Sequence, residues 1–179
     1  MKNRSVYNAA ALILSFLSSQ AMAQMLIGDD RGCKVLNSNP QPNESITWSG
    51  NCRDGYTDGQ GVLQWFKDGK AGSRYEGNMV KGRYDGKGNN TYANGNRYDG
   101  NWVAGTRSGN GTLTWANGDR YEGNWANGNQ SGKGTYTWAN GGRSEGSFVD
   151  GKFTDGIEYD PNGAVVAIYI NGQKQPGGK

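Results

Sequence analysis

The chain has 179 residues, with 19 Lys and Arg against 16 Asp and Glu, a formal charge of +3 and no His. The lack of His excludes Ser/His/Asp and Cys/His catalysis and His-ligated metals. Two Cys cannot build a four-cysteine zinc site, and the weak positive charge does not indicate nucleic-acid binding. The chain has 31 Gly but only 4 Pro, which excludes a collagen helix, and its 6 Trp, 10 Tyr and 4 Phe argue against disorder. The remaining explanation for the excess of Gly is a backbone conformation that recurs in a sequence repeat.

Residues 1–23 have the pattern of a secretory signal peptide. Lys2 and Arg4 precede an apolar stretch at residues 9–17, and residues 21–23 (AMA) form an A-x-A cleavage site. The apolar stretch is too short to span ~30 Å of hydrocarbon comfortably, which favours cleavage over an uncleaved anchor. We therefore expect an exported protein, periplasmic or extracellular, with a nearly neutral mature chain and no integral membrane segment.

Residues 24–45 precede the repeats and are expected to cap them. Cys33 lies in this segment, and Cys52 lies 19 residues further on, in the first repeat. Two Cys in an exported chain predict a Cys33–Cys52 disulfide, with free buried thiols as the alternative. Such a loop would stabilise the fold by about 3 kcal/mol in the loop-closure model and would fasten the cap over the first repeat.

From residue 46 to residue 163 the chain repeats itself about every 23 residues. Each well-kept copy carries Arg-Tyr-Asp/Glu-Gly-Asn, then Gly-x-Gly, then Asn-Gly. The first motif begins at residues 74, 97 and 120, and a degraded copy begins at 143. A further copy upstream, which begins near Trp48, is offset by 27 because of an insertion near residues 70–73. We count about five copies.

Inside one copy the pattern has a period of two, which is typical of strands. Tyr98 and Trp102 share one face of the first strand with Gly100 between them, and the bare Gly backbone leaves room for aromatic rings. Residues 103–108 are expected to be a loop that leads to the second strand.

The next copy is reached through Ala116-Asn117-Gly118. A three-residue turn with Gly118 left-handed pairs Leu113 with Tyr121 and keeps the apolar residues on one face, whereas a two-residue turn would mix the faces. Each copy is therefore predicted to be a β-hairpin. Five stacked hairpins give an all-β, elongated single-layer antiparallel ribbon with strands about 4.8 Å apart.

The chain after the repeats is more aliphatic. Residues 157–159 and 165–170, joined by a turn at 160–163, read as a closing hairpin. Residues 164–179 are thus expected to hold a capping strand followed by a loose tail from Gln173.

The unit Tyr-Glu/Asp-Gly-Asn-Trp, followed by Gly-x-Gly and Asn-Gly, resembles the MORN (membrane occupation and recognition nexus) repeat, best over residues 73–141. Met79 and Ser144 depart from its aromatic positions. The resemblance implies a ribbon of hairpins used as a scaffold or binding module, and lipid binding has been suggested for the family. No enzymatic activity carries over from it.

The aromatic face is read first as the core, since a single-layer sheet has little else to bury, and second as a ligand site for sugars, peptides or lipid headgroups; one face can do both. The charges at Arg97 and Asp99, repeated in each copy, are expected on the opposite, solvated face. The leading hypothesis is a non-catalytic scaffold in the cell envelope that binds a protein partner or an envelope component. The second is recognition of a glycan or lipid headgroup. No catalytic, cofactor or metal residues are predicted, and the face residues are Tyr75, Tyr98, Trp102, Trp115, Tyr121, Trp125 and Trp138.

Overall fold

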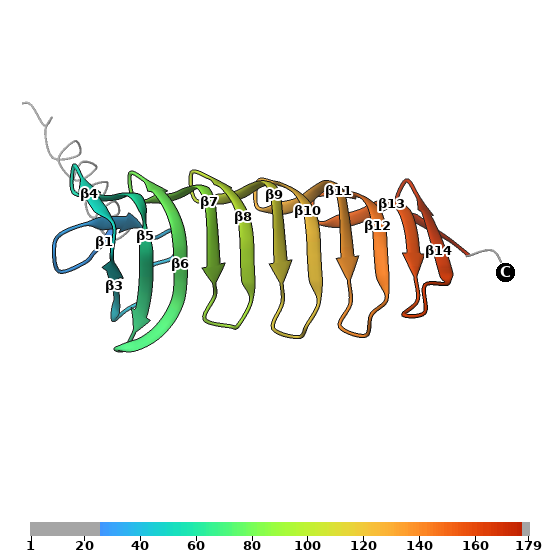
Figure 1. Ribbon diagram of the computed structural model, residues 1–179, viewed down its shortest axis with the longest axis horizontal. Coiled ribbons are helices and arrows are strands. Elements are labelled where there is room, and N and C mark those ends of the chain that lie inside the picture. Colours follow the sequence, from blue (N-terminus) through green and yellow to red (C-terminus); the bar gives the residue numbers. More distant parts are fainter. Residues whose placement is uncertain (1–25, 177–179) are drawn as a thin grey trace, which may run out of the picture.

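The computed structural model describes residues 26–176, which form an elongated all-β ribbon of stacked hairpins (Figure 1). The strands are β1 (Leu26–Gly28), β2 (Lys34–Leu36), β3 (Glu44–Trp48), β4 (Asn51–Arg53), β5 (Tyr56–Lys67), β6 (Lys70–Val80), β7 (Arg83–Thr91), β8 (Arg97–Val103), β9 (Thr106–Thr114), β10 (Arg120–Ala126), β11 (Asn129–Thr137), β12 (Arg143–Val149), β13 (Lys152–Tyr159), β14 (Val165–Ile170) and β15 (Gln173–Pro176). They belong to one open sheet of 15 strands, antiparallel except where β2 meets β5. The predicted hairpin ribbon is confirmed.

The predicted signal peptide, residues 1–23, lies outside the described residues. Between residues 26 and 176 no helix has the length and apolar character needed to cross a membrane.

One of the two kinds of turn in the ribbon is the turn that the sequence predicts. The Trp115 N–H donates to the Asp119 carbonyl over 2.9 Å, and the Gly118 N–H donates to the Trp115 carbonyl over 3.0 Å. Gly118 has φ +94°, and Leu113 pairs with Tyr121, so the three-residue turn is confirmed. The same turn recurs one copy earlier and one copy later, along the lower edge of the ribbon in Figure 1.

The other turn differs from the prediction. Strand β8 runs to Val103 and β9 begins at Thr106, so the loop expected over residues 103–108 is wrong. Ala104 and Gly105 instead form a two-residue turn with φ +49° and +88°. Two left-handed residues match the twist of the flanking strands. A left-handed Ala is uncommon, which is why the residue types here do not indicate so tight a turn.

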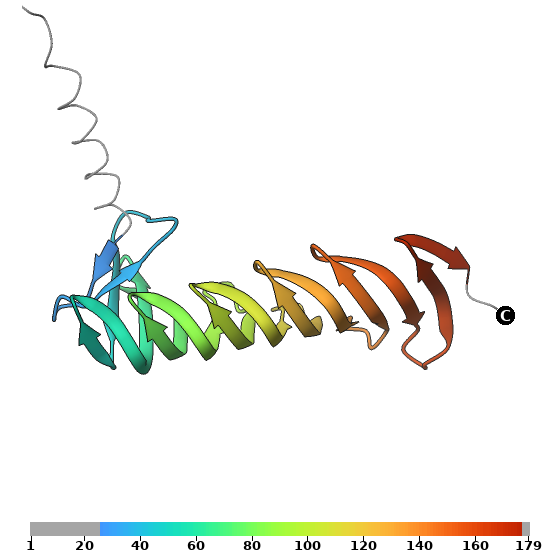
Figure 2. The same ribbon diagram turned by 90° about the horizontal axis from the view of Figure 1, so that it is seen from above.

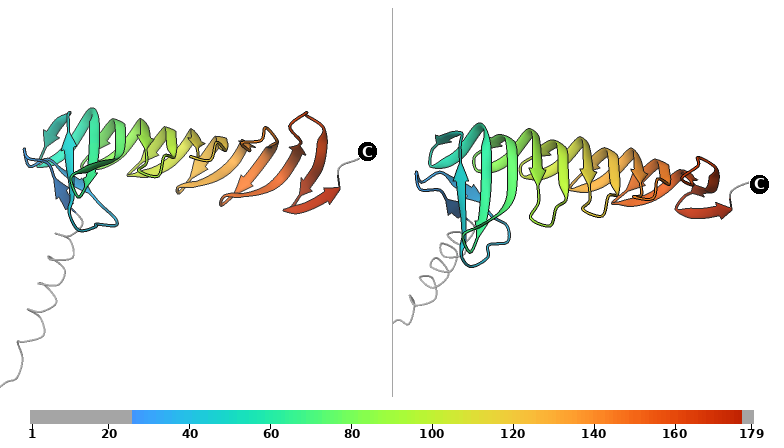
Figure 3. Two further views of the ribbon diagram at one scale, coloured as in Figure 1. Left: turned by 90° about the horizontal axis from the view of Figure 1, so that it is seen from below. Right: turned by 60° about the horizontal axis from the view of Figure 1, so that its bottom comes forward.

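Beside each two-residue turn the hairpin bends. The pairing of β8 with β9 shifts between Gly100 and Trp102, and such a bulge bends the strand locally. The bent tip reaches the preceding hairpin, because the Gly105 N–H donates to the Tyr84 carbonyl of β7 over 2.8 Å. Figures 2 and 3 show the resulting curvature of the strands across the ribbon. The sheet stays a single layer, but its aromatic face curls inward.

The core is a row of aromatic rings that lie over glycines. In the central copy Tyr98 is fully buried, and its hydroxyl donates to the Asn101 carbonyl over 3.0 Å. A Cβ placed on Gly100 would lie 2.7 Å from the Tyr98 hydroxyl oxygen. Trp102 meets the Tyr98 ring edge-on, with centroids 4.9 Å apart. The prediction that a ring occupies the place of the missing side chain is confirmed, but the ring over Gly100 is that of Tyr98 in the same strand and not one from a neighbouring strand.

The C-terminal end keeps the hairpin pattern. Phe148 is buried in the fifth copy at the position that Trp holds in the third and fourth copies, and β14 then pairs with β13 as a closing hairpin. Part of the expected loose tail is wrong, because residues 173–176 form β15 against β14. The left-handed pair Asn171 and Gly172 makes a two-residue turn that returns the chain to the sheet.

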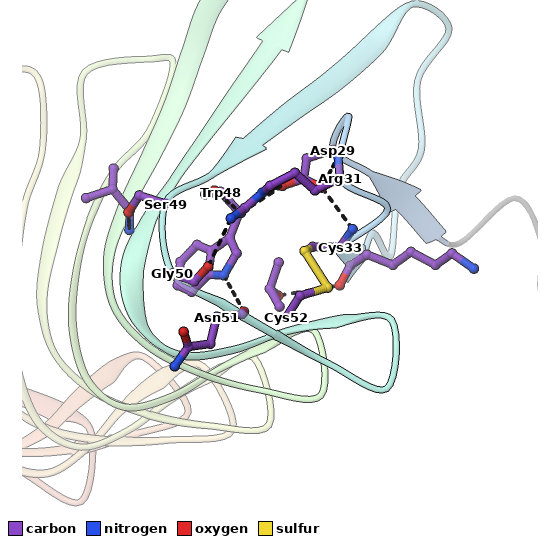
Figure 4. Close-up of polar contacts among 11 residues, drawn as sticks. Asp29, Arg31, Cys33, Trp48, Ser49, Gly50, Asn51 and Cys52 are labelled. Atoms are coloured by element: carbon purple, nitrogen blue, oxygen red, sulfur yellow. Dashed lines mark hydrogen bonds and ion pairs between the residues drawn. A yellow bond between two sulfur atoms is a disulfide. The ribbon is translucent and has the colours of Figure 1, made fainter.

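The N-terminal cap is fastened to the first copy, as Figure 4 shows. Cys33 and Cys52 form a disulfide with their Cα atoms 5.4 Å apart, as the sequence predicts. Beside it the Arg31 guanidinium pairs with the Asp29 carboxylate at 3.0 Å and donates to the carbonyl of Trp48. Trp48 is buried, so these contacts seal the end of the core.

Candidate binding groove

The structure separates the seven predicted face residues into two groups. Five lie in the core with at most 4% of their surface exposed, whereas Trp115 and Trp138 are half-buried. The bent tips provide the cover: Tyr84 stacks on Tyr75 with centroids 3.9 Å apart, and the Arg107 guanidinium lies 4.4 Å from the Trp125 ring. The five core residues are Tyr75, Tyr98, Trp102, Tyr121 and Trp125.

A second row of aromatic residues remains accessible. Trp65, Tyr92, Trp115 and Trp138 lie near the end of the second strand of successive copies and are all half-buried. We call them the aromatic ladder. They follow one another at intervals of 27, 23 and 23 residues. Because each copy adds two strands, successive rungs lie about 10 Å apart along the ribbon.

Three adjoining pockets, which we call the groove, run along this ladder. The first has a volume of about 390 Å³ and is lined by Trp65 and Tyr84, among other residues. The second, of about 420 Å³, shares those two rings and adds Tyr92. The third, of about 380 Å³, shares Tyr92 and adds Trp115. The groove therefore passes over at least two copies of the repeat.

The N-terminal cap bounds one end of the groove. The Leu36 N–H donates to the carbonyl of Gly82, a tip residue, over 3.0 Å, so β2 crosses the tips. Asn37, the next residue, lines both the first and the second pocket. Its side-chain amide donates to the Glu44 carboxylate over 2.8 Å, which holds the cap loop in place.

Four segments of this ribbon match the family model of the MORN repeat: residues 48–70, 75–97, 98–120 and 121–143, together just over half of the chain. The chain belongs to the MORN repeat family. No curated protein matches it. MORN repeats indicate a repeat-based binding or scaffold role, and proteins built from them are generally non-catalytic. The copy that begins at residue 143 lies beyond the matched segments, although it keeps the MORN hairpin.

Asn90 is a polar exception inside the MORN ribbon. It stands two residues after Gly-x-Gly, where the first, third and fourth copies have Leu63, Leu113 and Tyr136. It is 2% exposed and lines the second pocket, and its Oδ1 has no hydrogen-bond partner within residues 26–176. A buried amide without a partner costs about 1–3 kcal/mol. The second pocket thus holds an unused hydrogen-bonding group.

Burial keeps the phenols of Tyr84, in the groove, and of Tyr98, in the core beneath it, neutral at ordinary pH. Burial raises the pKa of Tyr84 to about 12, partly offset by the hydrogen bond that the Trp65 indole donates to it over 3.3 Å. Burial likewise raises the pKa of Tyr98 to about 12. Arg107 is engaged, because its guanidinium donates to the Gly128 carbonyl over 2.8 Å. The groove therefore offers mainly rings and neutral polar groups, with single cations in two of its pockets, Arg83 in the first and Lys67 in the second.

Beside the groove, polar side chains tie successive turns together. The Asp119 carboxylate accepts hydrogen bonds from the Tyr136 hydroxyl at 2.7 Å and from the Ala139 N–H at 2.8 Å, which lowers the pKa of Asp119. In the preceding copy Asn96 takes the same place and accepts from the Ala116 N–H at 3.0 Å. The row of turns along this edge is thus linked from copy to copy.

The opposite face of the ribbon carries the alternating charges. Arg74 pairs with Glu76 at 2.9 Å, and Arg120 pairs with Glu122 at 2.6 Å, with roughly half of each side chain exposed. Exposed pairs of this kind contribute about 0–1 kcal/mol each. Within the described range, 26–176, no group of three or more residues could hold a metal ion.

Sequence reasoning missed most of the residues that line the groove. Trp65, Tyr84, Asn90, Tyr92 and Arg107 were not among the predicted face residues. Alignment of the first four copies by column would have found two signals: an aromatic residue recurs ahead of each turn, and Asn90 interrupts an otherwise apolar column. The fifth copy departs from both columns, with Asp160 and Glu158. Which rings stay accessible depends on the bend of the tips, which the alternating pattern does not encode.

Proposed function

We propose that this MORN-repeat protein is a non-catalytic scaffold, exported to the cell envelope, that holds an extended ligand in the groove. The observation that carries the proposal is the aromatic ladder. Half-buried rings recur in four successive copies, about 10 Å apart, and three of them line adjoining pockets. A ligand with a repeating structure can contact several rungs at once, and its affinity then grows with its length.

Export is supported by two independent features of the chain. The N-terminal sequence has the arrangement of a signal peptide, and Cys33 and Cys52 are joined in the structure. Disulfides persist mainly outside reducing compartments. The groove would then meet protein partners, glycans or lipid headgroups of the envelope, in the periplasm or outside the cell.

Among these ligands, the chemistry of the groove favours a glycan over a lipid headgroup. The third pocket combines Trp115 and Trp125 with the side-chain amides of Asn94, Asn129 and Gln130. Flat rings pack against the carbon-hydrogen faces of sugars, and amides can both donate to and accept from hydroxyl groups. An anionic headgroup would instead require clustered Lys or Arg side chains, whereas Arg83 and Lys67 line different pockets.

The test is a titration of tryptophan fluorescence with three probes: soluble peptidoglycan fragments, neutral oligosaccharides and liposomes with anionic lipid. We expect one class to change the emission, and Trp115→Ala to weaken that binding about tenfold or more. Thr114→Ala, at the last residue of β9 and on the opposite face from Trp115, is the matched control and should bind as the wild type does. A bound ligand that responds equally to both variants would place the site outside the groove and refute the proposal.

A further inference from the structure

The second pocket of the groove contains a feature that the repeat itself does not require. Asn90 pairs in register with Tyr75 on one side and Tyr98 on the other, at the centre of the core. The neighbouring copies fill this position with Leu63 and Leu113, which leave no polar atom without a partner. A Leu at position 90 would make the fold more stable, so packing does not explain why this position holds an amide.

The surroundings of Asn90 identify the chemistry that would satisfy it. Trp65, Tyr84, Tyr92 and Trp102 line the same pocket of about 420 Å³, and Trp65, Tyr84 and Tyr92 are half-buried. An amide carries both an acceptor and a donor, which matches adjacent hydroxyl groups on a sugar ring. The aromatic rings offer flat apolar surfaces to the other side of such a ring.

The charges near the pocket argue against an anion. Its lining includes one carboxylate, Glu44, and one ammonium group, Lys67. The Glu44 carboxylate already accepts hydrogen bonds from the Asn37 side chain at 2.8 Å and from the Gln41 N–H at 2.9 Å. Recognition of phosphate or sulfate relies on clustered cations, so a neutral ligand fits this lining.

The position of the pocket indicates which part of the ligand it holds. Towards the C-terminus the pocket continues into the third pocket through Tyr92. Towards the N-terminus the cap bounds the groove, where Leu36 bonds to Gly82 and Asn37 lines the wall. A chain that lies along the groove therefore reaches its end at the cap, where the first pocket and the pocket around Asn90 share Asn37, Trp65 and Tyr84.

We infer that the pocket around Asn90 binds the terminal sugar of a neutral glycan, with the Asn90 amide bonded to a hydroxyl or acetamido group and the rings packed against the sugar. This inference rests on the proposed function of the groove and names its ligand. The remaining sugars of the chain extend along the ladder towards Trp115.

The experiment is calorimetry on the purified full chain with cello- and chito-oligosaccharides of two and six sugars. Asn90→Leu should lose affinity for both lengths by about tenfold or more while its melting temperature rises, because it loses the sugar contact and gains the packing of the other copies. Leu113→Asn, the reciprocal change, should only lower the melting temperature. Trp115→Ala should weaken the six-sugar ligand and leave the two-sugar ligand unaffected.

The outcomes separate the two proposals. Wild-type affinity in Asn90→Leu, with weakened six-sugar binding in Trp115→Ala, overturns the Asn90 assignment and leaves the groove proposal standing. Failure of the wild-type protein to bind any of these sugars also overturns the assignment, and the liposome and peptidoglycan titrations then decide the groove proposal. If Asn90→Leu does not fold, Tyr92→Ala replaces it, with the same expected loss for both lengths.

Discussion

Replacing Gly100 by Ala tests the packing rule on which every copy depends. The added Cβ would lie 2.7 Å from the Tyr98 hydroxyl oxygen, 2.8 Å from the Asn110 carbonyl oxygen and 2.5 Å from the Gly111 Cα. Two of these three neighbours are backbone atoms, and the third belongs to a buried ring whose hydroxyl is bonded to a carbonyl. Neither the backbone of β9 nor the Tyr98 ring can move away from the added Cβ without loss of packing.

We expect this variant to lower the free energy of unfolding by about 2–4 kcal/mol. Overpacking contributes about 1–3 kcal/mol, and loss of the Tyr98 hydrogen bond contributes about 1 kcal/mol more. Urea unfolding followed by tryptophan fluorescence measures the difference directly. A loss of this size is a large part of the ~5–15 kcal/mol that holds a typical domain together.

Gly72→Ala is the matched control for Gly100→Ala. Gly72 also lies within a strand, but its Cβ would have the Trp65 carbonyl at 3.6 Å and the Ala93 Cβ at 3.9 Å, both ordinary contacts. We expect this variant to be neutral or about 0.4–1 kcal/mol more stable, through the unfolded state. If the free energies of unfolding of the two variants differed by less than about 0.5 kcal/mol, the argument that Gly makes room for the Tyr ring would be wrong.

Three further predictions concern the turns and the cap. The Tyr136 hydroxyl keeps the folded-state pKa of Asp119 below its unfolded value, so this stabilisation is complete above about pH 4 and is lost as the pH falls through the folded-state pKa. Asp119→Asn should therefore flatten the fall in melting temperature on acidification, and an unchanged fall would contradict this. Removal of the disulfide by Cys33→Ala with Cys52→Ala should cost about 3 kcal/mol in urea unfolding, and reductant should lower the stability of the wild type but not of the variant. Gly118→Val should cost about 1–2 kcal/mol, because Val is forced to φ +94°, and unchanged stability would exclude the three-residue turn.

The sequence predicts the parts of this fold that depend on local rules. The alternation of apolar and polar residues selects the turn at Gly118, and the period of 23 predicts the stack of hairpins. Ala104 is a position that local rules do not predict. Its left-handed backbone is imposed by the twist of two long strands, and the residue type Ala does not indicate that conformation. A loop was therefore expected where the chain makes its tightest reversal.

The candidate site is less accessible to sequence reasoning than the fold. Tyr98 and Trp115 look equivalent in the pattern, since both are aromatic and share one face. The bend beside Trp102 buries Tyr98 and leaves Trp115 partly exposed, and that bend arises from the pairing between strands. Asn90 was within reach of sequence reasoning, because the first, third and fourth copies have an apolar residue in its column, and the polar exception is visible once these copies are aligned.

The hydrogen bonds between tips give the molecule a way to change its length. Gly105 bonds back to Tyr84, and Gly128 bonds back to Arg107 over 3.1 Å, in the same geometry one copy later. Duplication of a 23-residue segment would create one more such link and add one rung, about 10 Å, while both caps kept their partners. The length of the ribbon is thus set by the number of copies. A groove of this kind can become longer by duplication of a repeat, without any change to the two caps.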